Sequence, residues 1–190
     1  MAIILASSSP QRKKILKMLG LEFRAIPADI DEHHSGFKRP HAIVKSIAKR
    51  KAEAVSKYHP DAWVIGCDTI VLLSNGDISV KPKNRDDAGR ILKTYQNSYC
   101  DVYSGLAFMH YAGKKCFADF ERTRIHFRDF SDESMEEYLD TGEWQGRSGA
   151  MTIEGKGHWT SSMEGEYWNV VGLPVDLLKN YLKKLRLLPA

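Results

Sequence analysis

Hydrophobic positions at the start of the chain predict a strand followed by a helix. The apolar run at residues 3–5 is too short for a helix and is typical of a buried strand. Ser9 then stands directly before Pro10, which favours a helix start, because serine caps free backbone N–H groups and proline fits the first helical position. Apolar residues at helical spacing continue the pattern up to Gly20, where the helix is expected to end: Ile15, Leu16 and Leu19.

Longer patterns predict the rest of the framework. A helix is expected to begin at residue 40 or 41, because apolar residues then recur on one helical face. Residues 62–73 are apolar on both faces, as in a central strand. Residues 142–174 are rich in glycine and tryptophan but show little periodicity. The further expected elements are strands at 23–26, 78–80, 101–110 and 117–127 and helices beginning near Asn84, Ser131 and Pro174.

Three charged residues fall on faces that this pattern predicts to be buried. Arg12 shares a helix face with Leu16, Lys51 shares one with Ile47, and Asp68 lies in the middle of the central strand. Burying a charge is costly unless it is paired or binds a ligand. Lys51 therefore either extends its ammonium group to water or meets an anion. Asp68 either accepts buried backbone hydrogen bonds or binds a metal or takes part in a reaction.

Two glycine- or serine-containing segments are candidates for binding an anion. The first helical turn carries cations at residues 12–14, although cations are disfavoured at the positive end of a helix dipole. An anion held by backbone N–H groups and by the hydroxyls of Ser7 and Ser9 would account for them, and the alternative is a solvated basic helix. Arg147, in a glycine-rich segment, is a candidate to close over a phosphate.

An acidic cluster at residues 29–32 is a candidate for binding a metal ion. The adjacent His33 and His34 are interpreted as solvated loop residues, because neighbouring side chains seldom point to one centre. Carboxylates such as Glu32 suit a hard cation, Mg²⁺ or Mn²⁺.

Composition and charge narrow the class of protein. The chain has 190 residues, 43% of them apolar and 27% charged, with a net charge of +4 that permits an anionic ligand without indicating nucleic acid. The alternating cations at 122–128 are interpreted as solvated or interfacial, since aromatic residues do not interleave with them on that face. With no apolar run of membrane-spanning length, we expect neither nucleic acid nor a membrane as partner. The three widely spaced cysteines and the absence of an export signal predict a cytoplasmic protein: Cys67, Cys100 and Cys116.

Short motifs along nearly the whole chain resemble those of the Maf-type nucleoside triphosphate pyrophosphatases. Any one of these motifs is weak, but their joint order is specific. In chain order they are LASSSPQR at 5–12, IDE at 30–32, AKRKA at 48–52, GCDT at 66–69, KP at 81–82, GE at 142–143, SGA at 148–150 and VVGLP at 170–174.

The resemblance implies a fold, a reaction and a set of site residues. The fold is an elongated α/β domain over residues 1–190, similar to the inosine triphosphate pyrophosphatases, with a mixed sheet, flanking helices and two lobes around a cleft. The reaction converts a nucleoside triphosphate to a monophosphate and pyrophosphate with a divalent cation, Mg²⁺, Mn²⁺ or Co²⁺. Asp68 would accept a proton, and Glu32 would hold metal with it. The phosphates would be bound by Ser7, Arg12, Lys51 and Lys81.

The resemblance leaves the base, the assembly and one alternative function open. Family members that prefer dTTP and UTP carry arginine, threonine and glutamine at three positions, whereas those that prefer 7-methyl-GTP carry an aromatic residue, glutamine and glutamate. This chain has Gln11, Thr69 and Glu154 there and matches neither set fully. A homodimer is plausible from the resemblance. The alternative function is a nucleotide-binding regulator of cell division with little or no turnover.

Overall fold

A mixed β-sheet with helices on both faces forms the framework. The computed structural model describes residues 2–32, 39–79, 81–153 and 159–187. The strands are β1 (Ile3–Leu5), β2 (Arg24–Ala25), β3 (Trp63–Leu73), β4 (Ile78–Ser79), β5 (Tyr99–His110), β6 (Lys115–Phe127) and β7 (Thr160–Glu164). The helices are α1 (Pro10–Met18), α2 (Pro40–Ser56), α3 (Arg85–Lys93), α4 (Asp132–Asp140), α5 (Tyr167–Val171) and α6 (Val175–Leu185).

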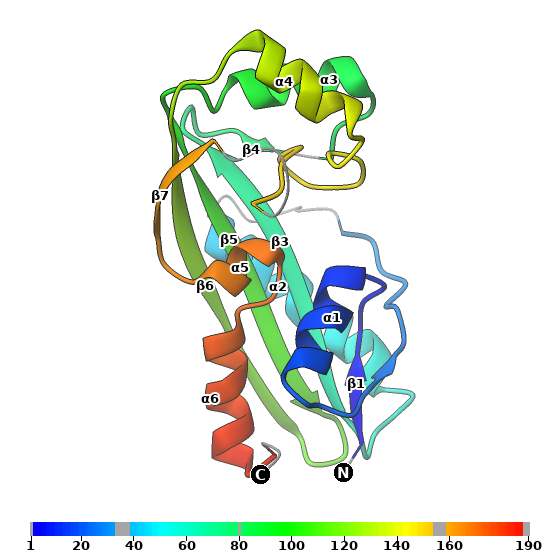
Figure 1. Cartoon of the computed structure of the whole chain (residues 1–190). Helices are drawn as coiled ribbons and strands as arrows, with labels where there is room; N and C mark the ends of the chain where they lie inside the picture. The colour runs from blue at the N-terminus through cyan, green and yellow to red at the C-terminus, as the bar shows by residue number, and fades with distance from the viewer. Residues whose placement is uncertain (1, 33–38, 80, 154–158, 188–190) are drawn as a thin grey trace.

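The sheet combines parallel and antiparallel pairing, as expected from the sequence. Its strand order is β2-β1-β3-β5-β6-β7, with β4 paired to β3. β1 runs parallel to β2 and β3, whereas β3, β5, β6 and β7 pair antiparallel in succession. The long strands β3, β5 and β6 give the molecule its elongated shape (Figure 1). The prediction that residues 1–190 form a single domain stays a prediction.

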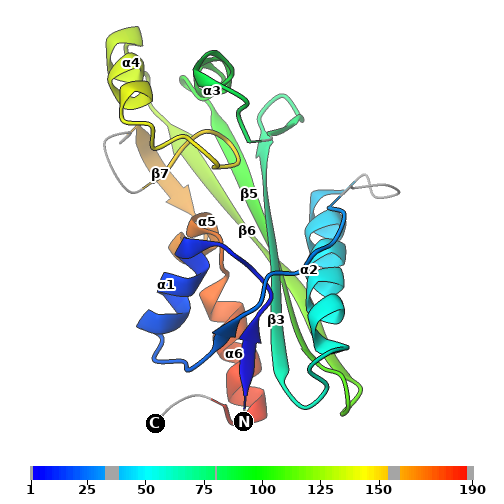
Figure 2. The same ribbon diagram turned by 90° about the vertical axis from the view of Figure 1, so that its right-hand side faces the viewer.

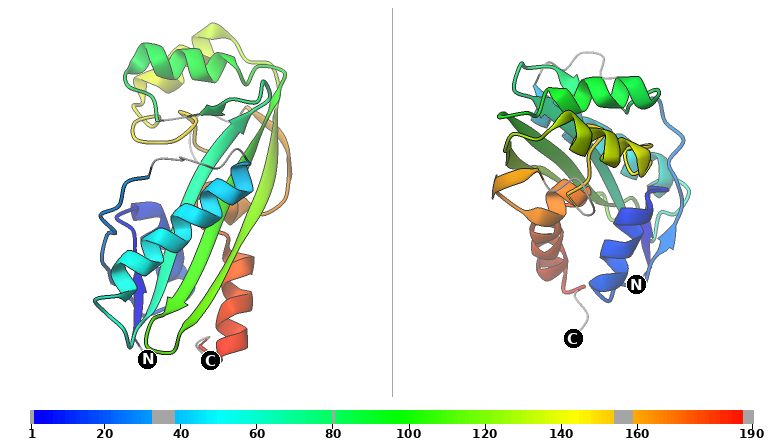
Figure 3. Two further views of the ribbon diagram at one scale, coloured as in Figure 1. Left: turned by 180° about the vertical axis from the view of Figure 1, so that it is seen from behind. Right: turned by 45° about the horizontal axis from the view of Figure 1, so that its top comes forward.

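Helix α2 covers one face of the sheet at very close range (Figures 2 and 3). A Cβ atom placed on Gly66 of β3 would lie 2.1 Å from the carbonyl oxygen of Ala48, and one on Gly105 of β5 would lie 2.2 Å from that of Val44. Helix backbone and sheet backbone therefore touch where the two glycines lie. This contact brings the buried face of α2, including Lys51, onto β3.

Two hydrophobic clusters occupy the opposite face. One packs α1 and α6 against the first half of β3 and the second half of β5, and includes Ile65 and Leu106. The other packs α3 and α4 against the end of β3, the start of β5 and the end of β6, and includes Val71 and Val102 (Figures 1 and 3). Thr69 lies on β3 between the two clusters and is only partly buried. A candidate site is therefore expected where the clusters leave the sheet open.

Helix starts predicted from the sequence are confirmed at three positions, each with a side-chain cap. The side chain of Ser9 accepts a hydrogen bond from the backbone N–H of Arg12, and Pro10 occupies the first turn of α1. Asn84 and Ser131 cap α3 and α4 in the same way. Along the described ranges, no helix combines the length and the apolar character needed to cross a membrane.

Candidate active site

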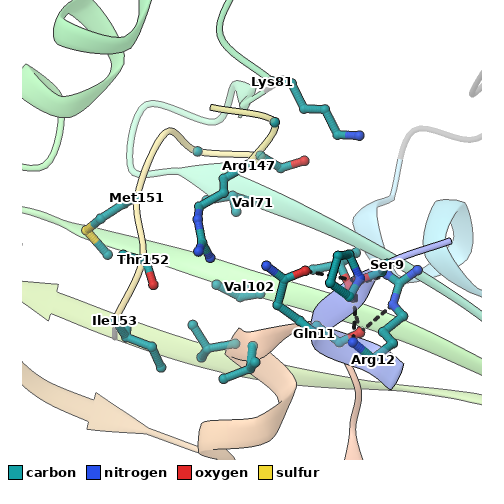
Figure 4. A pocket seen from close by; sticks show the side chains of 18 of the residues that line it. Ser9, Gln11, Arg12, Val71, Lys81, Val102, Arg147, Met151, Thr152 and Ile153 are labelled. Carbon is teal, nitrogen blue, oxygen red and sulfur yellow. Dashed lines mark hydrogen bonds between the residues drawn. The ribbon is translucent and has the colours of Figure 1, made fainter. Parts of the chain in front are cut away.

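A cavity of about 770 Å³ lies between the two clusters and extends past the edge of β3 to Glu32, Lys51 and Asp68. Its lining comes from the serine loop before α1, from β3, from the segment after β4, from residues 142–153 and from the end of α5. One edge of β3 contributes because, among the described residues, β1 pairs with it only as far as Ile65, and the pairing with β4 starts only at Val71. Segments far apart in sequence thus meet at one cleft (Figure 4).

A buried lysine joins the two predicted acidic residues. Lys51 Nζ lies 2.9 Å from Asp68 Oδ1 and 2.9 Å from Glu32 Oε1. The side chains of Lys51 and Asp68 are each 9% exposed, whereas that of Glu32 is 58% exposed at the mouth. Lys51 therefore does not extend to water. Its positive charge offsets the free-energy cost of burying the carboxylate of Asp68. No side-chain hydrogen bond from another described residue reaches Asp68 Oδ2.

The cations of the cavity act together on Glu32. Partial burial works to raise the pKa of Glu32, but the hydrogen bond from Lys51 and the charges of Lys51, Lys81 and Arg12 outweigh it and lower the pKa below its usual value. The same three cations that the sequence predicted to bind phosphates thus share one electrostatic neighbourhood. An anionic ligand entering here would be attracted by all three.

Arg12 holds the segments around the cavity in place. Its Nε donates to the carbonyl oxygen of Gly172 at 2.8 Å, and Nη1 donates to that of Cys67 at 3.0 Å and to Ser7 Oγ at 3.2 Å. Nη2 donates to Thr69 Oγ1 at 3.1 Å. Most of the guanidinium donors are already used by protein atoms. Arg12 is therefore a positioning residue in this structure, and its predicted contact with substrate stays a prediction.

The remaining predicted residues lie around the same cavity, with one exception. Ser7, Ser9 and Gln11 line it at the start of α1, where Ser9 Oγ donates to Gln11 Oε1 at 3.2 Å. Lys81 is exposed on the segment after β4, and Arg147 projects from the loop opposite (Figure 4). The exception is the third specificity candidate, which lies outside the described residues: Glu154.

Sequence reasoning missed a buried polar network behind Thr69. Thr69 Oγ1 lies 2.8 Å from Ser104 Oγ, which donates to the carbonyl oxygen of Asn169 at 3.1 Å. Asn169 Nδ2 in turn donates to the carbonyl oxygen of Val102 and to Thr123 Oγ1. The network ties α5 to β5 and β6, so it fixes the place of the Gly172 carbonyl that Arg12 contacts. The available signal was the presence of polar residues inside otherwise apolar strands.

Proteins of similar sequence identify the family. The family described as "Maf-like protein" matches residues 2–185. The chain belongs to the Maf-like family. A curated relative of this Maf-like chain, named dTTP/UTP pyrophosphatase, from Pelotomaculum thermopropionicum, is 42% identical over 183 residues and covers 96% of this chain and 95% of its own length.

A second curated relative and a solved structure are also similar to this chain. A Dictyoglomus thermophilum protein, also named dTTP/UTP pyrophosphatase, is 39% identical over 185 residues, covering 96% of this chain and 95% of its own length. Among solved structures, the Ham1 protein of Staphylococcus aureus aligns with a TM-score of 0.57 and 13% identity, covering 97% of this chain and 100% of that one. At this low identity the likeness shows the fold alone, and it confirms the α/β fold class expected from the sequence.

Two carboxylates of this Maf-like chain are candidate ligands for the divalent cation expected from the sequence. Within the described ranges no three His, Cys, Asp or Glu side chains gather into a cage, so the candidates are Asp68 and Glu32. Mg²⁺ often takes only one or two carboxylates and completes its shell with water and substrate phosphates. His33 and His34 lie outside the described residues.

Replacing Arg12 by lysine is expected to loosen the cavity of the Maf-like chain. A lysine ammonium group cannot reach four separate acceptors with the geometry of a guanidinium group, so several charge-assisted hydrogen bonds are lost. We expect the free energy of unfolding to fall by about 2 kcal/mol and nucleotide turnover to fall at least about tenfold. Urea unfolding and a pyrophosphate assay measure the two effects. Lys14→Ala, at an exposed position of the same helix, is the matched control and should change neither stability nor turnover. An Arg12→Lys protein that behaves like this control would contradict the positioning role of Arg12.

Proposed function

We propose that this chain hydrolyses dTTP and UTP to the nucleoside monophosphate and pyrophosphate. The observation that carries the proposal is the ion-paired group of Lys51, Asp68 and Glu32 at a cavity with further cations, because it combines a proton acceptor with charges that suit a triphosphate. Curated relatives about 40% identical over nearly the full length bear the name dTTP/UTP pyrophosphatase, which supports the same activity.

The proposed reaction is an in-line displacement at the α-phosphorus. A water oxygen bonds to the α-phosphorus while the bond from phosphorus to the bridging oxygen of pyrophosphate breaks. Asp68 takes the proton from this water at Oδ2, since Oδ1 is held by Lys51. Lys51 and Lys81 neutralise the charge that develops on the phosphate oxygens, and Arg12 keeps the serine loop in place.

A divalent cation, Mg²⁺, Mn²⁺ or Co²⁺, is proposed as cofactor, with Asp68 and Glu32 as its protein ligands. When bound, it supplies positive charge at the phosphate oxygens. Glu32 is exposed at the mouth of the cavity, where its carboxylate can reach a cation that enters from solvent.

The preference for dTTP and UTP is proposed from two sources. The relatives are named for these substrates, and Thr69 is the residue that members with this preference carry after the catalytic aspartate. Gln11 departs from their arginine, so the proposed preference does not rest on that position. The cytoplasmic location, the homodimer and the absence of nucleic acid as partner stay predictions.

Pyrophosphate release from a panel of triphosphates tests the proposal. We expect release from dTTP and UTP in the presence of Mg²⁺, Mn²⁺ or Co²⁺, loss of release on chelation, and slower release from CTP, 7-methyl-GTP and the purine triphosphates. Preferred cleavage of 7-methyl-GTP would overturn the choice of base. Nucleotide binding without any release would instead favour the alternative, a nucleotide-binding regulator of cell division.

A further inference from the structure

Arg147 lies in a different part of the cavity from Arg12 and Lys81. Figure 4 shows its side chain extending toward Val71 and Val102 on the sheet, whereas the side chain of Lys81 extends away from this region. Met151 and Ile153 line the same part of the cavity. A flat aromatic base suits such an apolar surface, whereas a triphosphate does not.

The electrostatic neighbours of Arg147 support this separation. The charges that lower the pKa of Glu32 come from Lys51, Lys81 and Arg12. The charge of Arg147 instead acts on Tyr138, a core residue of the α3–α4 cluster. Burial raises the pKa of Tyr138 to about 12, and Arg147 opposes that rise. Arg147 therefore belongs to the α3–α4 side of the cavity.

The loop that carries Arg147 is fixed by buried aromatic side chains. Before Arg147, Trp144 Nε1 donates to the carbonyl oxygen of Leu139 at 2.9 Å. After it, the hydroxyl of Tyr95 donates to the carbonyl oxygen of Gly149 at 2.9 Å, and the hydroxyl of Tyr138 donates to that of Ala150 at 3.2 Å. The backbone on both sides of Arg147 is thus anchored to the core of the α3–α4 cluster.

The side chain of Arg147 is also held by a hydrogen bond of its own. Its Nε donates to the carbonyl oxygen of Glu143 at 2.7 Å, which leaves the two terminal nitrogens directed into the cavity (Figure 4). These nitrogens can donate hydrogen bonds but cannot accept them. A fixed pair of donors beside an apolar surface selects a base that presents an acceptor at that point.

We propose that Arg147 is a specificity-determining residue that donates a hydrogen bond to O4 of a uracil or thymine base. Uracil and thymine carry a carbonyl oxygen at this position, whereas cytosine carries an amino group, which is itself a donor. O4 lies at the edge of the base remote from the ribose, and Arg147 lies on the α3–α4 side of the cavity, where its loop is anchored. This inference rests on the proposed hydrolysis of dTTP and UTP.

Arg147→Met tests the inference, with Lys81→Met as the matched control. Each substitution replaces a cation at the cavity by an uncharged chain of similar length. For Arg147→Met we expect kcat/KM for UTP to fall about 10- to 100-fold, as for loss of one charge-assisted hydrogen bond, while kcat/KM for CTP changes by less than about threefold. Inhibition by free pyrophosphate should stay unchanged. For Lys81→Met we expect UTP and CTP to lose activity by the same factor.

Equal losses for UTP and CTP in Arg147→Met, or weaker inhibition by pyrophosphate, would overturn the inference and leave Arg147 as a phosphate ligand. Should the methionine variant fail to fold by circular dichroism, Arg147→Lys keeps the charge but loses the Nε tether to Glu143. It must then lower the ratio of UTP to CTP turnover, and an unchanged ratio overturns the inference. If the wild-type protein releases pyrophosphate from neither UTP nor dTTP, the proposed function itself fails, and the inference fails with it.

Discussion

Asp68→Asn is expected to reduce nucleotide turnover by at least about 10³-fold while nucleotide binding persists. Asparagine has the shape of aspartate but cannot take up the proton of the attacking water. Lys51 keeps Glu32 as a charged partner at 2.9 Å, so the ammonium group is not left without a counter-charge. We therefore expect only a moderate loss of stability, about 1–3 kcal/mol, which is less than the cost of removing the only partner of a buried charge.

Two measurements on the same protein test this expectation. Pyrophosphate release gives turnover, and calorimetric titration with a non-hydrolysable analogue of UTP gives binding. Asp61→Asn is the matched control, because Asp61 is exposed just before β3 and the substitution removes the same charge. It should leave both quantities unchanged. Turnover of Asp68→Asn within about tenfold of the wild type would remove Asp68 from the role of proton acceptor.

The charged centre of the site could be predicted from the sequence because charge and hydrophobic pattern disagree there. Lys51 and Asp68 interrupt faces that are otherwise apolar, and each is costly to bury without a partner. The structure pairs them at 2.9 Å, so each accounts for the burial of the other. The local spacing of charges therefore singled out both residues, although it did not predict that they contact each other.

The parts of the fold that were missed depend on tertiary contacts rather than on local pattern. β7 reads TSSME and is mostly exposed, so it shows no apolar alternation, and it is defined by its pairing with β6. α5 spans 5 residues, too few to stand alone as a helix, and it is held by the buried hydrogen bonds of Asn169. The positioning role of Arg12 was also missed, because two of its four acceptors are backbone carbonyls, which carry no signal in the sequence.

The separation of the cavity into two parts likewise could not be predicted from sequence. Arg147 was expected to close over a phosphate because it is an arginine in a glycine-rich segment. Its direction is set by the hydrogen bond from Nε to the carbonyl oxygen of Glu143 and by the anchoring of its loop, to which the hydroxyl of Tyr95, a residue distant in sequence, contributes. An arginine side chain can bind either a phosphate or an uncharged hydrogen-bond acceptor such as a base oxygen. Only the place of Arg147 in the fold favours one of these two ligands.

Gly66→Ala is expected to be the most destabilising of the substitutions considered, and to abolish turnover as well. The added methyl group would lie 2.1 Å from the carbonyl oxygen of Ala48 and 2.7 Å from the backbone nitrogen of Ala52, so α2 must move away from β3. Neither neighbour is a side chain that can rotate aside. We expect the free energy of unfolding to fall by about 3 kcal/mol or more, as for overpacking of a rigid core.

The same displacement would separate Lys51 from Asp68, because Lys51 lies on the α2 face that Gly66 contacts. Gly89→Ala in α3 is the matched control: its added Cβ would meet only Leu139 Cδ1, at 3.5 Å, and alanine favours a helix over glycine by about 1 kcal/mol. In urea unfolding, the free energy of unfolding should therefore be lower than that of the wild type for Gly66→Ala and higher for Gly89→Ala. A Gly66→Ala protein as stable and as active as Gly89→Ala would show that α2 does not rest on the backbone of β3, and the burial of Lys51 would then need another cause.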